Sequence, residues 1–234
     1  MTWQHAIEKA SPSIVRIETP DGGGTGFVCC ALEGATFVGV ATAYHVVARA
    51  DYWHHPIRMV TSSGNTILLT ESERTILHER DSAIVTVPRD QLEPPGQLIP
   101  LLQKDWDIPV GWEVGWLGFP EIRPLDPCLL LGSVSFRAEH FYLLDGVGIR
   151  GVSGGTVLVK YEADPGEWRL NIVGSVSAYL PGQSSPLGLM AASDVSSLHE
   201  KMATLRSEEE LRQAWEKTSL SLNELAALIA QPPK

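Results

Sequence analysis

Short apolar runs, each closed by glycine, proline or another turn residue, follow one another through most of this 234-residue chain. Runs of four to ten residues that are rich in β-branched side chains are typical of strands rather than helices. The 21 glycines and 16 prolines are enough to supply turns between many strands. The pattern therefore predicts an all-β fold for most of the chain.

The expected strands fall into two sets. The first set covers residues 13–18, 26–32, 35–41, 57–61, 65–70 and 82–87, and the second covers 113–118, 128–137, 141–144, 155–160, 168–178 and 187–191. Within 82–87, Ala83, Val85 and Val87 share one face of an alternating strand. The stretch from 88 to 111 is rich in proline and is expected to connect the two sets.

After residue 194 the pattern changes from strand to helix. Val195, Leu198 and Met202 fall on one helical face, and Ser207 and Ser221 each begin a capping-box signature ahead of apolar residues. Two short amphipathic helices are expected. They either pack on the preceding sheets or dock a partner or a second copy of the chain, and the sequence leaves both open.

The segment Gly151-Val152-Ser153-Gly154-Gly155 places a serine between glycines, directly before an expected strand. Acyl transfer by serine needs an exposed hydroxyl on a tight turn and backbone N–H groups that are free to bind an oxyanion. Glycines permit both, because they allow backbone conformations that a side chain would block. On its own, however, such a segment is more often an ordinary turn.

Two earlier residues change that interpretation. His45 follows a small-residue strand and opens what looks like a helical turn, and Asp81 stands at the start of an alternating strand. A serine nucleophile needs an imidazole to take its proton and a carboxylate to orient that imidazole. Each residue alone would be an ordinary packed, surface or turn residue. Together, in the chain order His45, Asp81, Ser153, they indicate a catalytic triad in the chymotrypsin order.

The chain resembles the trypsin-like serine proteases, and among them the bacterial HtrA/Deg-type branch. The resemblance is carried, in order, by residues 13–17, 24–28, 42–47, 81–85, 118–120, 151–155 and 172–176. It implies the chymotrypsin/trypsin fold, with two six-stranded antiparallel β-barrels at residues 1–95 and 96–200 and a short helical tail at 201–234. It places His45 and Asp81 on the first barrel and Ser153 on the second.

The resemblance also implies an activity, that of a serine endopeptidase cleaving protein or peptide substrates through an acyl-enzyme. The N–H groups of Gly151 and Ser153 would form the oxyanion hole. The specificity pocket would have Val147 at its base and its walls at Ile149, Arg150, Ser175, Val176, Gly188 and Met190. Because no carboxylate falls at the base, the expected P1 residue is apolar.

Val152 marks a departure from the digestive branch of the family. In that branch the residue before the serine is an aspartate that pairs with a newly cut N-terminus. Val152 carries no charge, so activation by N-terminal cleavage is not expected. HtrA-type relatives usually continue into a PDZ domain, for which this sequence has no room.

Composition excludes several other classes of function. The net charge is −10 and Lys and Arg do not cluster, so nucleic acid and anionic membranes are not expected as principal partners. The histidines at 54, 55, 78 and 140 lack a metal-motif spacing, and no phosphate loop or dinucleotide fingerprint occurs, so no metal or other cofactor is expected.

Localisation is predicted to be cytoplasmic. The first ten residues lack the basic and apolar regions of a signal peptide, and no apolar run approaches about 18 residues. The three cysteines are Cys29, Cys30 and Cys128. A bridge between the two neighbours would be strained, so buried, reduced thiols in a reducing compartment are expected.

The main alternative function is a binding module that keeps the protease fold without cleaving its partner. A protease gated by a partner lies between the two. Compact relatives of this type are sometimes bacterial signalling or defence effectors, and the helical tail would then dock the activating protein.

Overall fold

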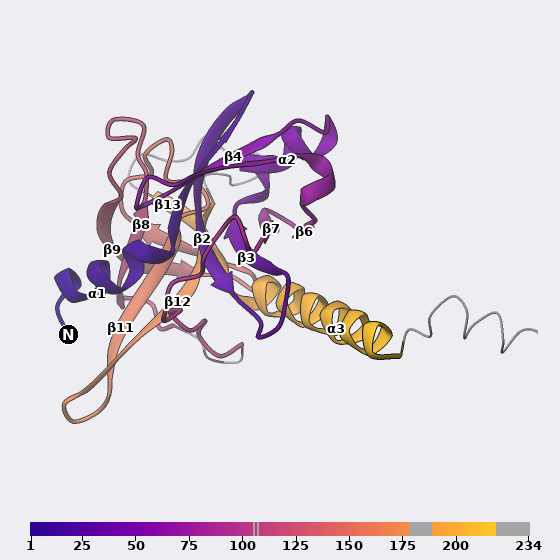
Figure 1. The fold of residues 1–234 in the computed structure, drawn as a ribbon. Helices are drawn as coiled ribbons and strands as arrows, with labels where there is room; N and C mark the ends of the chain where they lie inside the picture. The colour runs from indigo at the N-terminus through magenta and orange to yellow at the C-terminus, as the bar shows by residue number, and fades with distance from the viewer. Residues whose placement is uncertain (105, 107, 178–188, 219–234) are drawn as a thin grey trace, which may run out of the picture. The chain divides into compact units, whose positions relative to one another are not determined.

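The computed structural model describes residues 1–104, 106, 108–177 and 189–218. Its contacts divide the chain into one unit, Met1–Lys201, and a second unit, Met202–Lys234. The first unit contains a seven-stranded sheet and a six-stranded closed barrel (Figure 1). The predicted division at residues 95 and 200 into two barrels and a tail stays a prediction.

All pairings of the seven-stranded sheet are antiparallel. In spatial order its strands are β5 (Thr66–Leu69), β4 (Ile57–Thr61), β1 (Ile14–Thr19), β2 (Gly22–Cys30), β3 (Phe37–Thr42), β7 (Ser82–Pro88) and β6 (Ile76–Glu79). The sequence predicted six of these seven. The four-residue edge strand β6 was not expected, and the sheet is curled with β5 and β6 at its two edges.

The core of this sheet follows the alternation of its strands. Val38 and Val40 of β3 pack with Ala83, Val85 and Val87 of β7 in one buried cluster, which confirms the shared face predicted for β7. Burial of such side chains is the main term that stabilises the sheet.

The second sheet is a closed barrel whose pairings are also antiparallel. Its strands, in spatial order, are β10 (Phe141–Asp145), β13 (Leu189–Asp194), β12 (Glu167–Ser177), β11 (Thr156–Asp164), β8 (Glu113–Gly118) and β9 (Cys128–Arg137). All six were predicted from sequence. Trp116 of β8 is fully buried, and its ring lies against Gly132 and Gly146, where side chains would collide with it.

Two helices of the first unit belong to its N-terminal half. Helix α1 (Trp3–Ala10) was not expected; Thr2 caps it, and the Trp3 ring packs on Gly115 of β8. Helix α2 (Tyr44–Tyr52) confirms the helical turn predicted at His45. Two short 3₁₀ helices lie at Ser11–Ser13 and Glu71–Glu73.

Helix α3 (Ser196–Thr218) is a single helix of 23 residues. The helix start predicted at the Ser207 cap signature is wrong: α3 runs through Ser207, because no glycine or proline precedes it to end the helix. The helix predicted after Ser221 lies outside the described residues. In the described ranges no helix is both long and apolar enough to cross a membrane.

Candidate active site

The Ser153 loop is a tight turn between β10 and β11 that depends on its glycines. Gly151 has φ of +90° and Gly154 has φ of +82°, a backbone region that side chains disfavour. Space is also limiting at Gly154. A β carbon there would lie 2.2 Å from both the Thr25 carbonyl oxygen and Thr42 Oγ1. The loop therefore packs directly on the seven-stranded sheet.

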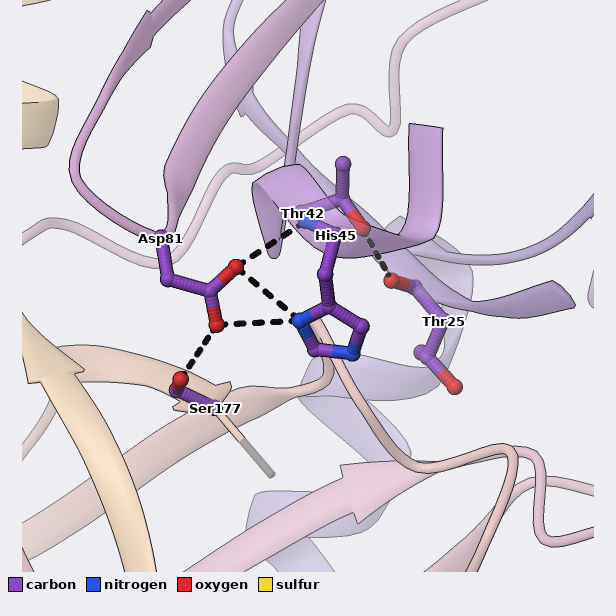
Figure 2. Close-up of polar contacts among 5 residues, drawn as sticks. All are labelled: Thr25, Thr42, His45, Asp81 and Ser177. Carbon is purple, nitrogen blue, oxygen red and sulfur yellow. Dashed lines mark hydrogen bonds and ion pairs between the residues drawn. The ribbon is translucent and has the colours of Figure 1, made fainter. Parts of the chain in front are cut away.

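Thr25 of β2, which is fully buried, ties the Ser153 loop to that sheet. Its N–H donates to the Ser153 carbonyl at 2.8 Å, and its hydroxyl donates to the Gly151 carbonyl at 2.7 Å. The same hydroxyl accepts from the Phe119 N–H at 2.9 Å. Thr42 in turn donates its hydroxyl to the Thr25 carbonyl at 2.7 Å (Figure 2). The loop is thus held against the end of β3, which leads into His45.

Asp81 provides the N-terminal cap of α2. The first N–H groups of a helix lack partners within it, and Ala43 at the N-cap offers no side-chain acceptor. The Tyr44 N–H donates to the Asp81 carbonyl at 3.2 Å, and the His45 N–H donates to Asp81 Oδ1 at 2.9 Å. Capping thereby positions the carboxylate beside the first turn of the helix.

The same carboxylate contacts the His45 ring. His45 Nδ1 lies 2.9 Å from Asp81 Oδ1 and 3.0 Å from Oδ2 (Figure 2). A proton on Nδ1 satisfies this contact and leaves Nε2 as an acceptor. That is the tautomer a general base needs, so the structure brings these two predicted residues together in a chemically useful arrangement.

Ser177, at the end of β12, is a site residue that the sequence analysis missed. Its hydroxyl donates to Asp81 Oδ2, so a barrel strand reaches a carboxylate on the other sheet (Figure 2). The only signal in the sequence is a serine at the end of an apolar strand. The contact joins residues 96 positions apart, which no local pattern reveals.

These contacts set the charge of Asp81. Burial alone raises the pKa of its carboxyl. Hydrogen bonds from the His45 ring, the Ser177 hydroxyl and the His45 backbone N–H outweigh that effect and hold the pKa below its ordinary value. The carboxylate is therefore ionised at neutral pH and can stabilise a positive charge on His45.

Two peptide units of the Ser153 loop have carbonyl groups that accept backbone hydrogen bonds. The Arg150 carbonyl accepts from the Glu121 N–H at 2.8 Å, and the Val152 carbonyl accepts from the Gly155 N–H at 2.8 Å. In a trans peptide the C=O and N–H of one unit point in opposite directions.

The N–H groups that share peptide units with these carbonyls belong to Gly151 and Ser153. Within the described ranges neither donates a backbone hydrogen bond. These two N–H groups are the ones that the sequence analysis predicts for the oxyanion hole. Ser153 is 8% exposed. Among the described residues, no hydrogen bond joins the Ser153 hydroxyl to the His45 ring.

The residues predicted to line a specificity pocket lie in different settings. Val176 is beside the serine loop, because it accepts from the Gly154 N–H at 2.7 Å and donates to the Gly155 carbonyl at 2.8 Å. The others are distributed as follows: Ser175 and Met190 are buried, Ile149 is partly buried, and Val147 and Arg150 are exposed. Gly188 lies outside the described residues.

Among the described residues, no group of three or more His, Cys, Asp or Glu side chains is arranged to bind a metal ion.

Comparison with known proteins identifies relatives in structure but not in sequence. No protein-family model and no curated protein matches the chain. A serine endoprotease from Yersinia pestis is 17% identical with a TM-score of 0.64, covering 88% of this chain and 66% of its own. Deg5 is 20% identical with a TM-score of 0.59, covering 84% and 90%. The HtrA-type protease AlgW is 18% identical with a TM-score of 0.63, covering 88% and 64%.

The chain thus spans about two thirds of the length of two of these relatives, at 66% and 64%. Identities of 20% or less relate the folds rather than the activities. The closed barrel and the second, seven-stranded sheet agree with that relationship. The chain has the chymotrypsin-like fold of the HtrA/Deg-type serine proteases.

Proposed function

We propose that the protein is a serine endopeptidase in which Ser153 is the nucleophile, His45 the general base and Asp81 the residue that orients His45. The observation that carries the proposal is the contact of the ionised Asp81 carboxylate with His45 Nδ1, beside a glycine-rich serine loop. An oriented base next to a serine on a tight turn is the arrangement that acyl transfer requires.

In the proposed reaction the Ser153 hydroxyl attacks a peptide carbonyl while His45 Nε2 takes its proton. Asp81 stabilises the resulting imidazolium, and the N–H groups of Gly151 and Ser153 bind the oxyanion. His45 then protonates the leaving amine, and water hydrolyses the acyl-enzyme by the same route. Each oxyanion donor of this kind contributes roughly 10²–10³ in rate.

The proposed specificity is for an apolar P1 residue. The residues predicted to form the base and walls of the pocket carry no carboxylate, which argues against a preference for Arg or Lys. Val152 is 2% exposed, and an apolar residue buried there is unsuited to pairing with a new N-terminal ammonium. A peptide library with a clear Arg preference at P1 would overturn this part of the proposal.

The test is labelling with a fluorophosphonate, which reacts with activated serines. Wild type should be labelled at Ser153, and Ser153→Ala should lose both the label and peptide cleavage. Ser82→Ala is the matched control, because Ser82 is a buried serine whose hydroxyl has no hydrogen-bond partner among the described residues. Cleavage that persists in Ser153→Ala would show that the proposed nucleophile is wrong.

One observation favours an alternative in which a partner gates the site. The described residues include no hydrogen bond between the Ser153 hydroxyl and His45, so the base and the nucleophile are not yet engaged. Catalytic hydrogen bonds often tighten only when substrate binds. Labelling that requires an added protein would indicate gating, and labelling under no condition would favour a cytoplasmic protein-binding module that uses its helical tail.

A further inference from the structure

The strand pair β2–β3 is interrupted at its cysteines. Val28 pairs with Val40, and the next aligned pair is Cys30 with Gly39, so Cys29 is an extra residue on β2. In a regular strand, neighbouring side chains point to opposite faces. A β-bulge changes that arrangement, because two consecutive residues then oppose a single residue of the partner strand.

Gly39, the residue opposite the bulge, leaves room for both thiols. A β carbon built on Gly39 would lie 2.3 Å from Cys30 Sγ and 3.7 Å from Cys29 Sγ. Both sulfur atoms therefore occupy the same side of the sheet, over the backbone of Gly39. The Cys29 thiol donates to the Gly39 carbonyl at 3.4 Å, and the Cys30 and Cys29 thiols are hydrogen-bonded to each other.

The pair is buried outside the candidate active site, and the ammonium of Lys201 interacts electrostatically with Cys29. Cys29 and Cys30 are 5% and 4% exposed, and the Ile84 side chain lies over the same glycine. The hydrogen bond from Cys30, together with burial, raises the pKa of the Cys29 thiol. Peroxide oxidation needs a thiolate, and a bridge between adjacent residues is strained, so neither chemistry suits this pair.

We infer that Cys29 and Cys30 form a dithiol site for a trivalent, thiophilic metalloid of the arsenic or antimony class. One pyramidal centre can bond two sulfur atoms that lie side by side on one face of a sheet. With an organoarsenic dihydroxide, two As–S bonds form and two As–OH bonds break. The two thiol protons leave with the hydroxides as two molecules of water, and no atom changes oxidation state.

A divalent metal such as zinc fits the site less well. Zinc takes four ligands in structural sites and three protein ligands in catalytic ones. The described residues include no group of three or more side chains able to hold a metal. A phenylarsenic group needs only two protein ligands, because its carbon substituent is the third.

The test adds equimolar phenylarsine oxide to the folded full chain and measures the intact mass. Wild type should retain one phenylarsenic group per molecule, and excess dimercaptopropanol should remove it. Cys29→Ala and Cys30→Ala should each retain none. Cys128→Ala is the matched control, because it removes the third cysteine, which is partly exposed on β9, and should bind as wild type does. A retained adduct in either of the first two variants overturns the site.

A thermal melt separates binding by the fold from binding by the unfolded chain, in which adjacent cysteines are also free to react. A ligand that prefers the folded state raises Tm, and one that prefers the unfolded state lowers it. The adduct should leave Tm of wild type unchanged or raised. A lowered Tm, or no adduct on wild type, would show that the bulge does not form the site. Melts without arsenical establish that the alanine variants are folded.

Discussion

At the scale of single residues, the Asp81 carboxylate combines two tasks in one position. It accepts from the His45 N–H at the start of α2 and from the His45 ring, so one group both caps the helix and orients the imidazole. Ser177 supplies a further donor from the barrel. Removing the Ser177 donor therefore weakens the hold on the Asp81 carboxylate without changing Ser153 itself.

Ser177→Ala is expected to slow fluorophosphonate labelling of Ser153 about tenfold to a hundredfold. Hydrogen bonds to charged groups contribute about 1.5–3 kcal/mol, and the lost donor leaves the carboxylate less well held. The rate of labelling, followed against pH, measures the effect. Ser82→Ala is the control, since it removes a buried hydroxyl next to Asp81 that makes no hydrogen bond within the part of the chain that the structure describes. Equal losses in both variants would indicate packing rather than the hydrogen bond.

Lys201 is only 6% exposed, so its charged form lowers the stability of the folded protein. Burial lowers the pKa of its ammonium from 10.5 to about 8, although Glu79 and Glu200 oppose the shift. Because its pKa is lower in the folded state, the unfolded chain binds the proton more tightly. The loss of stability caused by the buried charge is full below the folded-state pKa of about 8. It declines as pH rises toward the unfolded-state pKa of 10.5.

Lys201→Met should therefore raise the free energy of unfolding by about 1–3 kcal/mol at neutral pH. The gain over wild type should shrink as pH rises above 8, where wild-type lysine loses its proton in the fold. Urea denaturation at several pH values measures both effects. Lys9→Met, at an exposed lysine of α1, is the control. A gain in stability that is the same at every pH would show that the buried charge of Lys201 is not its cause.

At the scale of elements, the sequence was informative where a strand is bounded by its own turn residues. The bounds of β4, β8 and β9 were predicted to the residue. β6 was missed because its four residues carry no strong pattern and become a strand by pairing with β7. α1 was missed although Trp3, Ala6, Ile7 and Ala10 have the spacing of an amphipathic helix, because the segment is short and its other residues are polar.

The same distinction applies to the site. His45, Asp81 and Ser153 could be proposed from the sequence because each stands next to an expected strand and the three occur in one recognisable order. Thr25 and Ser177 were missed because their roles come from hydrogen bonds to residues 126 and 96 positions away. Such contacts exist only once both sheets have formed.

Gly154→Ala tests how closely the serine loop packs on the seven-stranded sheet. A left-handed backbone costs a non-glycine residue about 1–2 kcal/mol, and here the new methyl group would also collide with Thr25 and Thr42. The total loss of stability should be about 3 kcal/mol or more. Denaturant unfolding gives the value.

Gly166→Ala is the matched control for that substitution. Gly166 has φ of +83°, nearly the same as Gly154, but no atom within 4 Å of the position of a new β carbon. Only the backbone cost of about 1 kcal/mol should appear there. Similar losses in the two variants would mean that the loop can move away from the sheet.

At the scale of the whole unit Met1–Lys201, the candidate site is the place where the two sheets are joined. Thr25 of β2 bonds the loop that precedes β11, and Ser177 of β12 bonds Asp81 beside β7. The site is therefore complete only when both sheets are folded and docked. Acid should weaken this junction, because one of its groups is a carboxylate.

The sign of that effect follows from the lowered pKa of Asp81. Burial alone would raise the pKa, but the hydrogen bonds from His45 and Ser177 outweigh it and keep the folded value below 3.8. A carboxyl with a depressed folded pKa contributes stability above its unfolded value. That contribution is lost as pH falls through the folded value. Acid thus removes the junction's contribution below pH 3.8.

Asp81→Asn should accordingly be less stable than wild type by about 1–3 kcal/mol at neutral pH, since the amide is a weaker acceptor for these donors. The difference should disappear as pH falls below 3.8, where wild-type Asp81 takes up a proton and loses the same interactions. Urea unfolding across that range measures it, with Asp90→Asn at an exposed aspartate as the control. A stability difference between Asp81→Asn and wild type that persists in acid would mean that the shape of the Asp81 side chain, not its charge, stabilises the fold. The two sheets would then be joined by packing and by the hydrogen bonds of Thr25.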